Sequence, residues 1–240
     1  MATLALPHVE TQRPRAIAPA WHTVALVALF LVIATGGAQF QHRAHEHPAI
    51  ASRHSGVLPL YASLIVMEWG MLYYVWKGGL RRTGTSLREL IGGRWGSRRA
   101  FLTDAALAAG LWGAWMLFVF GWQRWMSPDT AASVESMLPR SILEGVLWIL
   151  LSVSAGICEE AVFRGYFQVQ FHAFTGSRWL AVILQALVFG IGHGYQGVTA
   201  CLKIALYGAM FGALAVWRRS LRPGMMAHAW TDIASGLMFR

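Results

Sequence analysis

The sequence has 240 residues, of which 56% are hydrophobic and 13% are charged. A soluble domain has about 45–50% apolar and about 25% charged residues, so the composition excludes an ordinary water-soluble globular protein. The net charge of +9 is compatible with nucleic-acid binding, but the basic residues lie between long apolar runs and form no single stripe. We therefore expect a protein of the lipid bilayer, with no nucleic-acid partner.

Seven apolar runs are long enough to cross a bilayer as helices, because a hydrocarbon core of about 30 Å needs roughly 20 residues. They span residues 16–40, 57–76, 101–122, 141–163, 179–195, 198–217 and 221–239. The first run is too long for the core of a signal peptide, so we expect it to be retained. The predicted fold is all-α: a polytopic helical membrane protein with about seven transmembrane helices.

The densest basic cluster lies between the second and third runs, where residues 77–99 contain seven Lys and Arg side chains. The positive-inside rule places this loop, and with it the N-terminus, in the cytoplasm. Residues 41–55 then form an external loop, for which a solvated segment is favoured over a metal site. Its histidines are His42, His45, His47 and His54. Arginine outnumbers lysine by 18 to 2, which indicates a GC-rich bacterial genome and hence a bacterial plasma (inner) membrane.

Ionisable side chains inside the predicted spans are candidates for function, because charge in a bilayer costs several kcal/mol. They are Glu68, Asp104, Glu144, Glu159, Glu160, Arg164, His193, Lys203, His228 and Asp232. Asp104 and Glu144 lie within a turn of a span end, which favours a structural role. Glu68 and Lys203 are isolated in sequence, so we expect each to meet a polar partner or to face a water-filled cavity.

The remaining six residues form three short groups. Arg164 follows Glu160 by four residues, so the two share a helix face and Arg164 can neutralise that carboxylate. Glu159 projects about 100° away and has no such partner, which indicates one structural and one working carboxylate. His228 and Asp232 are also four residues apart, so Asp232 can orient or charge-stabilise the imidazole.

The turn expected at residues 175–178 links two of these groups. Glu159 precedes this turn by about as many residues as His193 follows it, so in an antiparallel hairpin the two side chains face each other at similar depth. His228 lies closer to the basic residues 218–222 and is expected to be shallower. The helix containing Glu159 is expected to continue through residues 165–175, beyond the membrane. This extension would place the groups of Glu159 and His193 nearer the cytoplasmic side.

Two imidazoles with a carboxylate pair can activate water for amide hydrolysis in two ways. Glu159 can act as a general base while a histidine polarises the scissile carbonyl. Alternatively, His193, His228 and a carboxylate can bind Zn²⁺ and leave one position open for water. The HExxH spacing of zinc proteases is absent, and a buried polar network that only holds helices together is the structural alternative.

The same residues resemble a known family. Residues 159–165, EEAVFRG, look like the EExxxR motif of the CAAX prenyl protease and bacteriocin-processing (CPBP, abortive-infection) family. Residues 189–193, FGIGH, match its FxxxH motif, and residues 228–232, HAWTD, match a third motif in which Asn or another polar residue follows a histidine by four positions. The resemblance covers residues 141–239, and the three motifs in this order are specific.

This resemblance implies an intramembrane endopeptidase acting on a membrane-anchored peptide or protein, such as a bacteriocin leader or a C-terminal sorting signal. Glu159 and His193 would activate the water, and His228 with Asp232 would stabilise the oxyanion. Glu160, Arg164 and Phe189 would support them. Asp232 replaces the Asn of the prenyl-protease branch, and an ionised Asp cannot donate a hydrogen bond, so orienting His228 or binding a metal is the more plausible role for it.

The resemblance leaves the cofactor open between Zn²⁺ or another divalent metal and none. It divides the chain into an N-terminal transmembrane scaffold with the basic loop, residues 1–140, and a CPBP-like catalytic transmembrane domain, residues 141–240.

Three other functions compete with this one. A catalytically silent immunity or scaffold protein would use the same polar network for packing. A cysteine hydrolase would pair Cys158 with His193, but the two carboxylates beside Cys158 disfavour a thiolate. A transporter would use Glu68, Lys203 and the histidines as a proton path, yet the sequence lacks a repeated pair of Gly/Pro-broken helices.

Overall fold

The computed structural model describes residues 15–46, 57–125 and 137–238, and every regular element in these ranges is helical. The long helices are α1 (Ala20–Glu46), α3 (Val57–Val75), α6 (Arg98–Trp125), α8 (Ile142–Glu159), α10 (Arg178–Gly192), α11 (Val198–Arg218) and α12 (Arg222–Leu237). The shorter elements are α4 (Arg81–Thr83), α5 (Leu87–Ile91), α9 (Gln168–Thr175), the π-helices η1 (Trp76–Leu80) and η2 (Glu160–Phe167), and the 3₁₀ turn η3 (Gly194–Gln196). The prediction of an all-α membrane protein is confirmed.

Five of the helical runs are long and apolar enough to cross a membrane: Ala20–Phe40, Val57–Thr83, Arg98–Arg124, Ile142–Thr175 and Val198–Arg218. The two other predicted spans correspond to α10 and α12, which have only 15 and 16 residues. Helix α10 stops at Gly192, where the chain turns into η3. The expected number of about seven is therefore approximate, with five full-length spans and two shorter helices.

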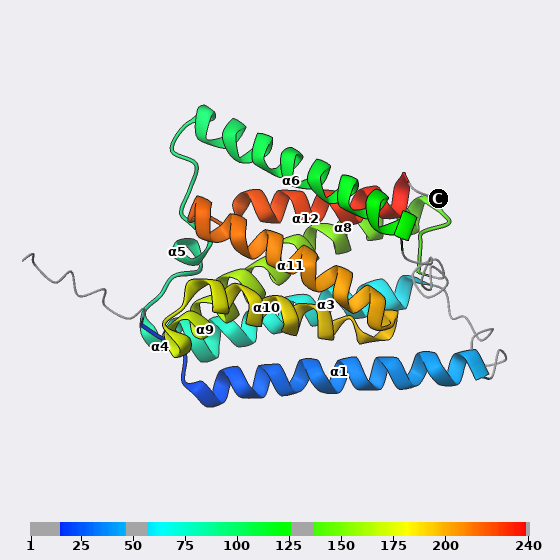
Figure 1. The fold of residues 1–240 in the computed structure, drawn as a ribbon, viewed down its shortest axis with the longest axis horizontal. Helices are drawn as coiled ribbons and strands as arrows, with labels where there is room; N and C mark the ends of the chain where they lie inside the picture. Colours follow the sequence, from blue (N-terminus) through cyan, green and yellow to red (C-terminus); the bar gives the residue numbers. More distant parts are fainter. Residues whose placement is uncertain (1–14, 47–56, 126–136, 239–240) are drawn as a thin grey trace, which may run out of the picture.

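The helices lie alongside one another in a bundle, with α1 along one edge and α6 along the opposite edge of the view (Figure 1). Helix α8 packs against both α3 and α12, while α10 packs against α11. Helix α6 covers α12, and α1 contacts α10 and η3. This arrangement brings α3, α8, α10, α11 and α12 around a common interior.

Glycines allow the closest helix contacts in this interior. A Cβ atom added at Gly156 of α8 would lie 2.8 Å from the backbone oxygen of Met225 and 2.8 Å from the backbone nitrogen of Ala229, both on α12. A Cβ atom at Gly208 of α11 would lie 3.0 Å from the Phe189 ring of α10. Gly208 and Gly212 form the small-xxx-small pair of α11, which lies in the contact with α10 as such pairs do between membrane helices.

The distribution of polarity is that of a protein surrounded by lipid. Large apolar side chains point outward on several helices, including Leu117, which is 75% exposed, and Val66, which is 72% exposed. Charged and amide side chains are buried instead, with Glu160, Arg164 and Gln185 each at most 2% exposed. A charged side chain inside such a bundle either pairs with another polar group or belongs to a functional site.

The basic segments predicted to share one side of the membrane meet at one end of the bundle. The Leu221 amide donates a hydrogen bond to the Ile91 carbonyl over 2.9 Å, and the Thr83 hydroxyl donates to the Ile17 carbonyl over 3.3 Å. The N-terminal end of α1, the segment around α5 and the start of α12 therefore lie together. At the other end of α1 the helix continues to Glu46, so His42 and His45 lie on it and not in a loop. His47 and His54 lie outside the described residues.

Two of the ionisable residues have structural partners, as expected. Asp104 is fully buried and forms ion pairs with Arg218 over 2.8 Å and with Arg222 over 3.2 Å. Glu144 closes a capping box with Ser141 at the start of α8. Both carboxylates are therefore accounted for by helix packing and helix capping.

Candidate active site

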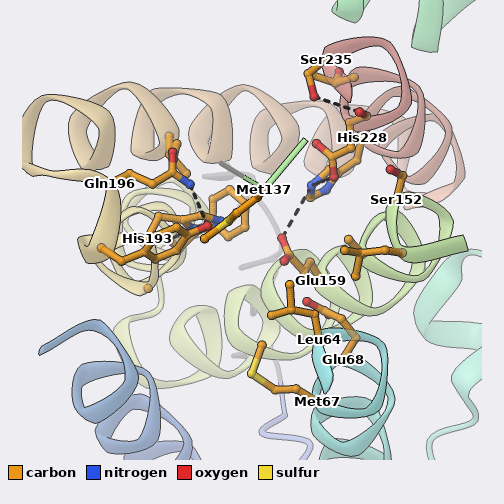
Figure 2. A pocket seen from close by; sticks show the side chains of 18 of the residues that line it. Leu64, Met67, Glu68, Met137, Ser152, Glu159, His193, Gln196, His228 and Ser235 are labelled. Carbon is orange, nitrogen blue, oxygen red and sulfur yellow. Dashed lines mark hydrogen bonds and ion pairs between the residues drawn. The ribbon is translucent and has the colours of Figure 1, made fainter. Parts of the chain in front are cut away.

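A cavity of about 520 Å³ lies in the interior of the bundle. Its wall is mostly apolar, but it contains the carboxyl and imidazole groups of Glu68, Glu159, His193, His228 and Asp232 (Figure 2). Phe189 also lines it. The structure thus brings side chains of all three sequence motifs to one cavity.

The two adjacent glutamates are separated by a change of helix type. Glu159 ends α8, and Glu160 begins the π-helix η2. Single π-helical turns are rare and occur often at functional sites; nothing in the residue spacing predicted this one. The Glu159 side chain is 14% exposed and lines the cavity, whereas the Glu160 side chain is 1% exposed and lies behind the wall.

Glu160 is held by two partners. An Arg164 guanidinium nitrogen lies 3.0 Å from its Oε1 atom, and neither side chain is more than 1% exposed. The Arg164 guanidinium also lies over the Phe189 ring at 4.2 Å, a favourable cation–π distance. The predicted i,i+4 pairing is therefore present, and Phe189 has a structural reason to be aromatic.

Glu160 also determines the orientation of His228. The Nδ1 atom of His228 donates a hydrogen bond to Glu160 Oε1 over 2.9 Å. Its Nε2 atom consequently faces the cavity, 3.6 Å from Glu159 Oε2 and 3.7 Å from Asp232 Oδ2. Both distances exceed hydrogen-bond length, which leaves Nε2 able to contact a bound group.

His193 follows α10 as its C-terminal capping residue. Its Nδ1 atom donates to the Phe189 carbonyl over 2.9 Å, so in the neutral ring the unprotonated Nε2 atom is available to the cavity. Figure 2 shows His193 and Glu159 on different walls of this space. The predicted hairpin explains the arrangement, since Gly176 turns the chain with φ of 72° and Ser177 caps α10.

His228 was expected to be shallower than the other two groups, but it lines the same cavity. The run from Ile142 to Thr175 is one continuous helical segment, as predicted from its aromatic and glutamine content. The close contact of α8 with α12 at Gly156 then places His228 beside Glu160. The depth of His228 is therefore set by packing between helices. Residue spacing along the chain does not predict that packing.

One acidic residue of the cavity wall, Glu68, is isolated in sequence from the three motifs. Glu68 of α3 is 4% exposed, lines the cavity, and interacts through its carboxyl group with that of Glu159. The expectation that it faces a cavity or a polar partner is met on both counts. A lone acid within an apolar run was the available signal, but its partner lies 91 residues further along the chain.

The predicted alternative of a metal site requires converging donors. Among the described residues, no three His, Cys, Asp or Glu side chains are arranged to hold a metal ion. His193, His228 and Asp232 line the same cavity but do not converge on one point. Cys158 is buried and is not among the residues that line the cavity, so the side chains as placed fit neither a resident Zn²⁺ ion nor a cysteine nucleophile.

Comparison with known protein families gives one match in the C-terminal part of the chain. Residues 141–234 match the Rce1-like family, described as type II CAAX prenyl endopeptidase Rce1-like. No curated protein and no solved structure matches the chain. The matched segment includes all three motifs, which confirms the family resemblance, and it excludes Glu68.

Proposed function

We propose that this integral membrane protein, whose residues 141–234 belong to the CAAX endopeptidase family, is an intramembrane endopeptidase in which Glu159 activates water. The observation that carries the proposal is the meeting of Glu159, His193 and His228 in one mostly apolar cavity. A water molecule bound there lies against a mostly apolar wall. Within hydrogen-bond reach of a carboxylate it can be deprotonated as it attacks a peptide carbonyl.

In this mechanism Glu159 is the general base and later the general acid. It takes the proton of the attacking water and returns it to the leaving amine when the C–N bond breaks. His193 orients the water through Nε2, because Nδ1 is engaged by the Phe189 carbonyl. Glu159 Oε2 makes no hydrogen bond among the described residues, which suits a group that is to receive a proton.

His228 faces the developing oxyanion in this scheme. Its Nδ1–H bond to Glu160, which Arg164 neutralises, leaves Nε2 directed into the cavity. When the ring carries both protons, Nε2–H is a donor for negative charge on the carbonyl oxygen. Glu160 and Arg164 are positioning residues, and the Asp232 carboxylate lies near the charged ring, 3.7 Å from Nε2.

The substrate we propose is a peptide or protein with a hydrophobic segment anchored in the bilayer. Apolar side chains make up most of the cavity wall, including Leu64, Met67 and Met71 of α3, so an extended apolar chain is accommodated better than a polar one. We place the protein in a bacterial plasma membrane with its basic end and N-terminus in the cytoplasm. Cleavage then takes place within or near the membrane.

A catalytically silent scaffold or immunity protein is the alternative, with the same residues used for packing. Glu160 suits such a role, since its carboxylate is buried and bonded to both Arg164 and His228. Glu159 does not, because its exposed edge lines a cavity and one of its oxygens has no hydrogen-bond partner among the described residues. A residue kept only for packing is normally satisfied.

The test compares purified wild type with Glu159→Gln in proteoliposomes. The probes are a quenched farnesylated CAAX peptide and a set of quenched peptides with one apolar span. We expect Glu159→Gln to lose at least about 10²-fold in cleavage rate, the lower range of general base catalysis. Glu144→Gln is the matched control, because Glu144 caps α8 away from the cavity and Gln serves in a capping box.

Cleavage retained by Glu159→Gln would refute the glutamate mechanism. Lack of cleavage by wild type on every probe would favour the silent scaffold. A chelator added to active wild type separates the two kinds of hydrolysis: lost activity restored by Zn²⁺ would indicate a metal enzyme, and unchanged activity would indicate water activated by Glu159 alone.

A further inference from the structure

The oxyanion side of the cavity lacks a neutral hydrogen-bond donor at the position where the family motif has one. Position 232 holds Asp, and an ionised carboxylate has only acceptors. Its Oδ2 atom lies 3.7 Å from His228 Nε2. If oxyanion stabilisation needs a second donor beside His228, another side chain has to supply it.

Tyr207 of α11 is placed for this. It lines the cavity and is 6% exposed. Its ring meets the His228 ring edge-on, with centroids 5.6 Å apart, and packs against Phe211 at 4.2 Å and Trp115 at 4.6 Å. Aromatic packing on three sides holds the phenol beside the imidazole.

The Tyr207 hydroxyl has no geometric hydrogen-bond partner among the described residues, although its oxygen is buried. Thr231 and Asp232 are close enough to interact with it. The Thr231 hydroxyl donates its own hydrogen to the Ala227 carbonyl over 2.7 Å, so toward Tyr207 its oxygen can only accept. Buried hydroxyls are normally bonded, and an unbonded one at a cavity wall is suited to a ligand.

We propose that Tyr207 is a catalytic residue that donates a hydrogen bond to the oxyanion, the task for which Asp232 is unsuited. The inference rests on the proposed function. The water oxygen bonds to the carbonyl carbon, its proton passes to Glu159, and the carbonyl oxygen becomes the oxyanion. The Tyr207 O–H group and His228 Nε2–H stabilise that charge and keep their protons, and collapse breaks the C–N bond while Glu159 protonates the amine.

Tyr207→Phe removes the hydroxyl and keeps the ring. On the probe that wild type cleaves best, we expect kcat to fall about 10²–10³-fold, as for loss of one oxyanion donor, with KM within about 2-fold because ground-state contacts are unchanged. The thermal unfolding temperature should stay close to the wild-type value, since the hydroxyl has no geometric hydrogen-bond partner among the described residues. Tyr73→Phe, on the exposed side of α3, is the matched control and should cleave like wild type.

A double-mutant cycle separates this role from a structural one. Asp232→Asn introduces an amide donor beside His228, so in that background Tyr207→Phe should cost at least about 10-fold less in kcat than in wild type. An equal cost in both backgrounds, a rise in KM without a fall in kcat, or full activity of Tyr207→Phe would each overturn the inference. Because Glu159→Gln is measured on the same probe, an active wild type with an inactive Glu159→Gln and an active Tyr207→Phe refutes only the role of Tyr207.

Discussion

Replacing Arg164 with Met is expected to be among the most destabilising single changes in the protein. Arg164 Nη1 lies 3.0 Å from Glu160 Oε1, and the two side chains are 0% and 1% exposed, so solvent screens the pair little. Coulomb attraction at this distance is about 5.5 kcal/mol for an effective dielectric constant of 20. The Met side chain fills part of the space but leaves His228 as the hydrogen-bond partner of Glu160 among the described residues. Removal of one member of a buried pair costs about 3–5 kcal/mol.

The assay is reversible unfolding in mixed micelles, followed by tryptophan fluorescence from the 12 Trp residues. Arg178→Met is the matched control, because Arg178 is exposed at the start of α10, and it should change the unfolding free energy by less than about 0.5 kcal/mol. Combining Arg164→Met with Glu160→Gln should recover part of the loss, since no buried charge is left unpaired. A loss below about 1 kcal/mol for Arg164→Met, or no recovery in the double variant, would show that the pair does not stabilise the site.

Two further changes test the packing around the site with the same unfolding assay. Gly156→Ala should lose about 1–3 kcal/mol, because its Cβ would lie 2.8 Å from the backbone of α12, whereas Gly110→Ala, with nothing within 4 Å, should be neutral or stabilising; equal effects would disprove the close contact. Gln170→Leu should cost about 1–3 kcal/mol for each orphaned donor, because the Gln170 carbonyl accepts from the amides of Ile17 and Ala18 over 2.7 and 3.1 Å. Hydrogen exchange at those two amides should accelerate, and unchanged exchange would show that Gln170 does not hold the segment that precedes α1.

Features of the fold that depend on neighbouring residues were predictable from the sequence. The turn after Thr175 has a glycine with positive φ and a serine N-cap, both of which are local signals. The pairing of Glu160 with Arg164 follows from helix periodicity, and the structure contains it. Local signals in residues 160–167 do not predict the π-helix η2, which packs against α3 and α10.

Features that depend on contacts between helices far apart in the sequence could not be predicted from it. Glu68 looked isolated because its position along α3 says nothing about α8, yet packing of these two helices brings its carboxyl group to Glu159. Tyr207 carries no signal in the sequence, since a tyrosine in an apolar span does not show whether its hydroxyl is bonded. Both residues line the cavity from outside the three motifs. The motifs therefore identify a family, whereas the chemistry of this particular site also depends on the side chains that the surrounding helices add to it, including one from the part of the chain expected to act only as scaffold.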